Sequence, residues 1–163
     1  MTPEQLLLVK ADILANPDLA AMPQGSDGSD AIARMYMQPA VPAYIVWKTS
    51  LQRADIYNPT SLEATTWDWT TYKAQSVTEQ GAWREMFMGD IANPSLPNFR
   101  AGVEKIFGTL NAQTVHVKAV SKRPATRIEK LLASGLGTTV APSTMTHEGN
   151  VTYKEIDAAR AMP

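Results

Sequence analysis

The chain has 163 residues, of which 44% are hydrophobic and 19% charged, and its net charge is −1. This size and balance predict one folded domain with a sizeable core and exclude a disordered chain. The chain has no cysteine, which excludes disulfides, thiolate metal ligands and cysteine nucleophiles. No apolar run approaches the roughly 20 residues that a bilayer requires, so we expect no contact with a membrane.

The first helix is predicted from a capping box. Thr2 and Gln5 stand at its two positions, with Pro3 between them at the first helical position. The helix should end near Ala15, before Asn-Pro. A short turn and a flexible segment over 23–30, rich in turn-forming residues, are expected to follow.

Ser29 or Asp30 is the expected cap of a second helix that Pro39 ends. A short strand over 44–47 and a helix over 51–57 should follow. Between 60 and 75, alternating tryptophan and polar residues predict a strand or an ordered loop.

Ser76 and Glu79 form a second capping box, and the apolar spacing predicts an amphipathic helix continuing to Ile91. Another helix should run from Pro97 to Leu110.

The longest predicted helix covers 110–135. Pro124 lies inside it, so either the helix kinks there or two helices abut. Gly135 and Gly137 provide left-handed positions that end it. An extended arm over 138–152 and a terminal helix over 153–161 complete a mainly α, single-domain helical bundle spanning 1–163, with short strand or extended loop segments.

Charge is distributed unevenly along the chain. Residues 1–99 carry 11 acidic and 6 basic side chains, whereas residues 100–135 carry 2 acidic and 7 basic ones. Within a set of five basic residues, Lys118, Lys122 and either Arg127 or Lys130 recur at roughly helical intervals. They are expected to line one face, as a DNA-channel or interface surface or simply as a solvated helix face. The full set is Lys118, Lys122, Arg123, Arg127 and Lys130.

Catalytic and metal-binding patterns are absent from the sequence. The two histidines, His116 and His147, are 31 positions apart and lack metal-ligand spacing. His147 and Glu148 form a weak acid–base candidate, with a solvated loop histidine as the alternative. We therefore expect no enzyme activity, no cofactor and no metal.

Several blocks of the sequence resemble a family of small virion proteins of tailed bacteriophages. The similarity covers most of the chain. Its blocks are VWKTS at 46–50, DW at 68–69, NPSLPNFRAG at 93–102, KRPATRIEKLLASGLGTT at 122–139 and the P-S-T-M…EG…TY run at 142–153.

The role that this resemblance implies is a head-to-tail connector, of the adaptor or head-completion type. Such a subunit would be made in the host cytoplasm and form a homo-oligomeric ring of about twelve copies in the neck of the virion. The ring would surround the DNA channel, contact packaged DNA non-specifically, and join the portal protein to a stopper or tail protein.

The expected contacts outside the subunit lie in the loop 24–30, the aromatic segment and the C-terminal arm. The individual candidates for partner docking are Gln24, Asp27, Trp67, Trp69, Val140, Met145 and Tyr153. Two other functions stay open: a helical DNA-binding regulator that uses the basic segment 118–130, and a small hydrolase that uses His147.

Overall fold

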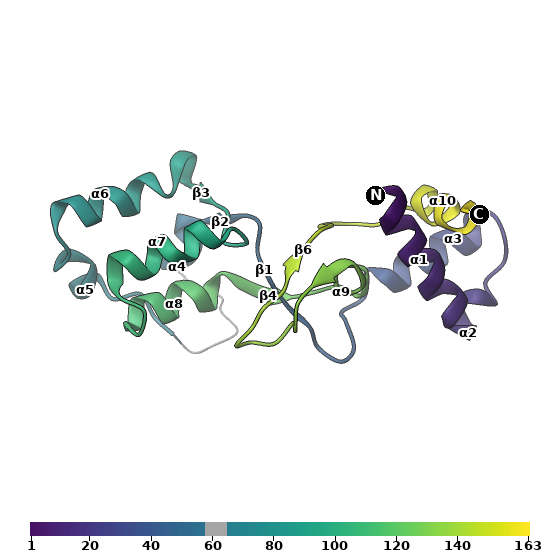
Figure 1. The fold of residues 1–163 in the computed structure, drawn as a ribbon, viewed down its shortest axis with the longest axis horizontal. Coiled ribbons are helices and arrows are strands. Elements are labelled where there is room, and N and C mark those ends of the chain that lie inside the picture. Colours follow the sequence, from purple (N-terminus) through teal and green to yellow (C-terminus); the bar gives the residue numbers. More distant parts are fainter. Residues whose placement is uncertain (58–64) are drawn as a thin grey trace. The chain divides into compact units, whose positions relative to one another are not determined.

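The computed structural model of the protein describes residues 1–57 and 65–163 (Figure 1). The predicted mainly α class is confirmed, because helices account for 54% of the described residues. The helices are α1 Pro3–Ala15, α2 Pro17–Ala20, α3 Ser26–Tyr36, α4 Arg53–Tyr57, α5 Trp69–Lys73, α6 Val77–Glu85, η1 Met88–Asp90, α7 Pro97–Phe107, α8 Ala112–Val120, α9 Arg127–Leu132 and α10 Tyr153–Ala161. The strands are β1 Ile45–Trp47, β2 Leu51–Gln52, β3 Ile91–Ala92, β4 Lys122–Pro124, β5 Ala133–Ser134 and β6 Thr144–Met145.

Contacts along the chain divide this predicted single helical domain into two compact units. Unit 1 consists of Met1–Val46 and Pro124–Pro163, and unit 2 consists of Trp47–Arg123. Unit 2 is therefore an insertion in the sequence of unit 1. Each unit has its own hydrophobic core.

The core of unit 1 lies among α1, α3, α9 and α10. The predicted capping box of α1 is confirmed, since the Thr2 side chain accepts from the Gln5 amide and the Gln5 side chain accepts from the Thr2 amide. The terminal helix α10 is confirmed as well, with Thr152 and Glu155 as its capping box. The largest fully buried side chains of this core are Val9, Leu19, Ile32, Tyr36, Ile128 and Ile156.

The flexible segment predicted over 23–30 is largely helical. Gly25, with φ of 99°, is the N-cap, so α3 begins at Ser26 rather than at a cap formed by Ser29 or Asp30. Gly28 lies so close to the preceding turn that an ideal Cβ would be 2.0 Å from the Pro23 carbonyl oxygen. The glycines that suggested flexibility therefore permit a tight helix start.

Polar contacts hold α10 against the start of α3. The Ser29 hydroxyl donates to the Asp157 carboxylate. The Arg160 guanidinium donates to the Pro23 carbonyl at 2.8 Å and to the Met22 carbonyl at 2.9 Å. Segments from opposite ends of the sequence are thus joined within unit 1.

Short strands complete the fold. The predicted strand near 44–47 is confirmed as β1, which pairs with β4. In unit 1, β5 and β6 pair antiparallel, with Ala133 opposite Met145. In unit 2, β2 and β3 pair antiparallel, with Leu51 opposite Ala92. Part of the predicted C-terminal arm therefore belongs to a sheet.

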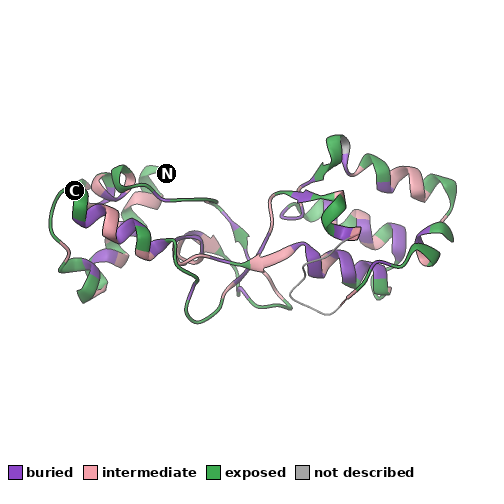
Figure 2. Ribbon diagram, turned by 180° about the vertical axis from the view of Figure 1, so that it is seen from behind, coloured by how far each residue is buried: buried purple, intermediate pink, exposed green. Residues whose placement is uncertain are grey.

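An aromatic cluster forms the core of unit 2. The buried residues of the helices in this unit are coloured purple in Figure 2. Trp67 and Trp83 stack with ring centroids 5.3 Å apart, and Phe107 meets both rings edge-on. Val117 and Val120 of α8 close the cluster. Such aromatic pairs contribute about 0.5–1.5 kcal/mol beyond the area they bury.

Three element boundaries in unit 2 differ from the predictions. The helix expected from Pro97 to Leu110 ends at Phe107, because Gly108 has φ of 90°. The helix expected over 51–57 begins at Arg53, because Leu51 and Gln52 form β2. The capping box at Ser76 is confirmed, but α6 ends at Glu85. Of the later apolar residues in that predicted helix, Met86 is the C-cap of α6, Phe87 precedes η1, and Ile91 belongs to β3.

The prediction of a strand or an ordered loop around the two tryptophans is wrong from Trp69 onward, where helix α5 begins. Asp68 is the N-cap of helix α5, since its carboxylate accepts from the Thr70 amide at 2.8 Å and from the Thr71 amide at 3.2 Å. This cap favours a helix more strongly than the alternation, which is only five residues long, favours a strand. The start of the predicted segment, residues 60–64, lies outside the described residues.

The long helix predicted over 110–135 is also wrong. Residues 122–124 form β4 between α8 and α9, so the segment neither kinks as one helix nor joins two helices end to end. Pro124 has no amide hydrogen for a helical bond. A capping box of Thr126 and Glu129 then starts α9 afresh. Gly135 and Gly137 do have positive φ, at 123° and 64°.

Candidate functional site

The five basic residues predicted to share one helix face lie on three different elements. Lys118 is on α8, the pair at 122 and 123 is in β4, and Arg127 and Lys130 are on α9. The prediction of one continuous face is therefore wrong, because the helix that would have carried it is interrupted.

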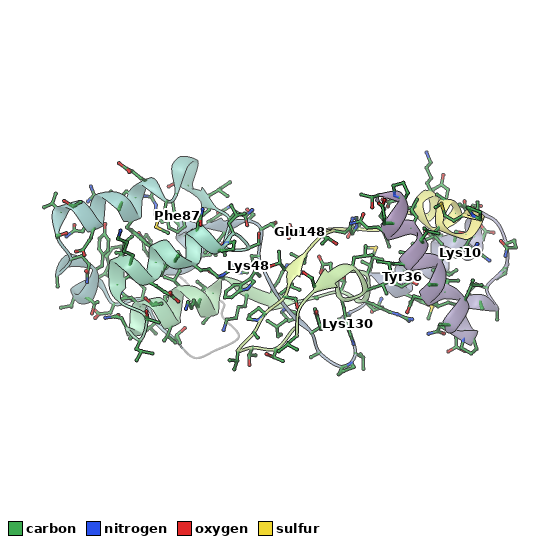
Figure 3. The ribbon with its side chains drawn as sticks, viewed as in Figure 1. Lys10, Tyr36, Lys48, Phe87, Lys130 and Glu148 are labelled. Carbon is green, nitrogen blue, oxygen red and sulfur yellow. The ribbon has the colours of Figure 1, made fainter. Side chains whose placement is uncertain are left out.

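In unit 2, the basic side chains are used in local contacts. Lys118 forms an ion pair with Glu104 of α7, and both side chains are about one-third exposed. The Arg100 guanidinium lies 4.7 Å from the Trp47 ring centroid. Burial lowers the pKa of Lys48, which is labelled in Figure 3. The nearby Asp55 carboxylate acts in the opposite direction, and the Arg123 guanidinium lowers this pKa further.

The recognition helix that a helix-turn-helix regulator would need is mostly buried. Six of the nine residues of α8 are buried, and they include Gln113, His116 and Val120. The exposed residues Ala112 and Val115 are apolar. This helix therefore lacks the polar exposed face that reads base edges in a groove.

In unit 1, Arg127 belongs to a cluster that joins α1, α3 and α9. Its guanidinium is 3.3 Å from the Asp12 carboxylate and 5.3 Å from the centroid of the Tyr36 ring. The Tyr36 hydroxyl donates to the same carboxylate at 2.8 Å. Burial, with the hydrogen bond to Asp12, raises the pKa of Tyr36 well above its usual range. The phenol therefore stays a neutral donor.

A cavity of about 580 Å³ lies beside this cluster. The ammonium of Lys130, which is labelled in Figure 3, donates to the backbone carbonyl of Val41 at 3.3 Å, and both residues line the cavity. The lining residues are Asp12, Asn16, Met35, Gln38, Pro39, Val41, Arg127, Lys130 and Leu131. We call this space the Lys130 cavity. Its residues are far apart in the sequence, and Arg127 and Lys130 were the only ones predicted as candidates.

The predicted docking residues fall into two groups. Trp67 and Met145 are buried within their own units, and their contact with a partner stays a prediction. Exposed positions are occupied by Gln24, Asp27, Trp69, Val140 and Tyr153. Asp27 is on α3 rather than in a loop.

The most exposed apolar side chains of unit 1 include Leu136 and Val140, which are 76% and 94% exposed. We call residues 135–141, which carry both, the apolar loop. At its start, the Tyr44 hydroxyl donates to the Gly135 carbonyl at 2.9 Å, and the Gly137 carbonyl accepts from the Ile45 amide at 2.7 Å.

The tip of the apolar loop is a hydrogen-bonded turn. The Thr138 amide donates to the Ala141 carbonyl at 3.1 Å, and the Ala141 amide donates to the Thr138 hydroxyl at 2.9 Å. An ideal Cβ on Gly137 would lie 2.1 Å from the Tyr44 ring, so glycine is required at this position. The loop therefore presents its apolar side chains from a fixed backbone.

The two histidines have different surroundings. The buried His116 ring contacts the Ile56 carbonyl at 2.8 Å and the Thr65 hydroxyl at 3.0 Å through its two nitrogens. His147 has a buried Nε2 without a hydrogen-bond partner among the described residues. Within residues 1–57 and 65–163, no group of three or more acidic or histidine side chains is arranged to hold a metal ion.

No helix in the described part of the chain combines the length and hydropathy needed to cross a bilayer. Comparisons with protein-family models, curated proteins and solved structures give no match to this chain.

Proposed function

We propose that this protein is a structural virion protein of a tailed phage. Copies of the chain form a ring in the neck, which joins the portal to the stopper or tail and surrounds the DNA channel. The role is binding, without turnover. The proposal starts from the sequence blocks that resemble phage virion proteins, and the apolar loop is the structural observation that supports it.

An ordered loop that exposes large apolar side chains is suited to assembly. Exposure of the apolar side chains of Leu136 and Val140 to water is unfavourable. Covering such side chains stabilises an interface by roughly 25 cal/mol per Å² of apolar area buried. Because hydrogen bonds already fix the loop backbone, docking orders few additional degrees of freedom.

Helix α1 adds a second apolar surface in the same unit. Leu7 and Leu14 are 45% and 65% exposed and lie seven residues apart, so they share one face of the helix. A subunit with two separate apolar surfaces has what a head-to-tail contact requires, since such contacts join different patches on neighbouring copies and close into rings.

The test compares assembly of the wild type with that of Val140→Asp. Negative-stain microscopy and light scattering, with and without purified portal protein, should show rings or portal caps for the wild type. Val140→Asp should remain monomeric with an unchanged circular dichroism spectrum. Val77→Asp is the matched control, because Val77 is a similarly exposed valine, at 88%, on α6 of unit 2.

A wild-type chain that stays monomeric with and without portal would contradict the proposal. Salt-sensitive affinity of that monomer for duplex DNA would support the regulator instead. If Val140→Asp forms rings as well as the wild type does, the neck role stands but the apolar loop is not part of the interface.

A further inference from the structure

We propose that the Lys130 cavity binds an acidic side chain carried between apolar residues on a segment of a neighbouring protein. The inference rests on the proposed function only in assigning that segment to a virion neighbour. The cavity lies within unit 1, and its volume of about 580 Å³ falls in the range of ligand-binding pockets.

The lining of the cavity carries excess positive charge. Arg127 and Lys130 are cationic, and Asp12 is the one acidic residue among the lining residues. The Asp12 carboxylate already accepts from the Tyr36 hydroxyl and the Arg127 guanidinium. One cationic charge is therefore left without a compensating carboxylate in the lining.

That remaining charge is located on Lys130. Its ammonium donates to a neutral partner, the Val41 carbonyl at 3.3 Å, and forms no ion pair within the described part of the chain. An incoming carboxylate replaces this contact with a neutral carbonyl by an ion pair, in which the ammonium donates to an oppositely charged acceptor. The carbonyl of Val41 can then turn to water.

The rest of the lining selects what carries the carboxylate. Met35 and Leu131 are half-buried apolar walls, and Val41 is 89% exposed at the rim. A nucleic-acid backbone needs several cations in line and makes no use of these walls. A peptide with apolar residues on both sides of a glutamate covers the walls and the charge together.

The probes are the peptides acetyl-Leu-Glu-Leu-amide and acetyl-Leu-Gln-Leu-amide, titrated into the full-length protein and followed by methyl NMR signals. The glutamate peptide should shift the signals of Met35, Val41 and Leu131 in a saturable way. The glutamine peptide should bind about tenfold more weakly, because it lacks the charge.

The variant Lys130→Gln should weaken the glutamate peptide by about tenfold and leave the glutamine peptide unchanged. Lys154→Gln on α10 is the control, since Lys154 is exposed and lies outside the cavity lining. Octanoate is a third probe, which carries a carboxylate on a chain without peptide groups.

Equal affinities for the two peptides, or no loss of affinity in Lys130→Gln, would overturn the proposal. Binding of octanoate without binding of the glutamate peptide would overturn the protein segment as occupant. Ring formation is scored separately by microscopy, so a monomeric protein that binds the glutamate peptide contradicts the neck role alone.

Discussion

Alanine substitution at two helical glycines should change stability in opposite directions. Gly28 of α3 and Gly81 of α6 both have helical backbone conformations that alanine can adopt. Where the added methyl group meets no obstacle, replacing glycine by alanine within a helix contributes about 1 kcal/mol of stability. Their surroundings differ. A Cβ at Gly81 meets no atom within 4 Å, whereas a Cβ at Gly28 meets the Pro23 carbonyl oxygen at 2.0 Å and its carbon at 2.9 Å.

The clash at Gly28 involves backbone atoms, so a side-chain rotation cannot relieve it. The start of α3 must move, and overpacking of this kind costs about 1–3 kcal/mol. The same movement disturbs the contact of Ser29 with Asp157 and of Arg160 with the Pro23 carbonyl. We therefore expect Gly28→Ala to lose about 1–2 kcal/mol overall, and Gly81→Ala to gain up to about 1 kcal/mol.

Urea titrations followed by circular dichroism measure both changes, and the two units are scored separately if the transition has two phases. Helical content at zero urea should be unchanged for Gly81→Ala. A Gly28→Ala protein that is as stable as the wild type would refute the argument that the segment before α3 approaches the helix so closely that glycine is required.

Three further predictions concern caps, pH and the core. Ser76→Ala removes the capping box of α6 and should cost about 1 kcal/mol in urea titrations, whereas Ser50→Ala, at an exposed position outside any cap, should cost little. Hydrogen bonds from the Thr71 hydroxyl and the Thr70 amide lower the pKa of Asp68 in the folded protein. The stability that this cap contributes is therefore present above the unfolded pKa near 3.8 and is lost as pH falls through the lower folded pKa. An NMR titration of the carboxyl carbon should show that Thr71→Val raises the pKa of Asp68. Ile128→Ala, at a fully buried position, should cost about 2–5 kcal/mol by calorimetry, and an unchanged melting temperature would contradict its place in the core.

Local sequence signals predicted helix starts better than helix ends. The capping boxes at Thr2, Ser76 and Thr152 each pair a side chain with an amide three residues away, so the sequence alone specifies them. The box at Thr126 and Glu129 carries the same signal, but the apolar stripe of the predicted long helix concealed it. Recognising that box would have separated α8 from α9.

The candidate sites depend on contacts that periodicity does not encode. The Lys130 cavity combines residues of α1, α3 and α9, and no local spacing brings Asp12 next to Arg127. The burial of Trp67 likewise depends on Trp83 and Phe107, which come from other helices. Val140 was predicted as a partner-docking residue and is 94% exposed, but its contact with a partner stays a prediction.

The discontinuous unit 1 should fold without its insertion. The points where the chain leaves unit 1, near Val46, and re-enters it, near Pro124, lie close together. The Ala125 amide donates to the Tyr44 carbonyl at 2.8 Å, and Val46 and Ala125 belong to a small apolar cluster with Met145. A short linker can join adjacent points, and closing it costs less chain entropy than closing the long insertion that it replaces. Replacing residues 47–123 by a short Gly-Ser linker should therefore leave unit 1 folded.

Circular dichroism and two-dimensional NMR of this shortened protein provide the measurement. We expect a cooperative melt and dispersed amide signals, with the Tyr36 hydroxyl contact to Asp12 retained, because every residue of that cluster lies in unit 1. The matched control adds Ile128→Ala to the shortened protein and should lower its melting temperature. A shortened protein with collapsed amide dispersion would show that unit 1 takes its stability from unit 2, and the two cores would then have to be treated as one cooperative structure.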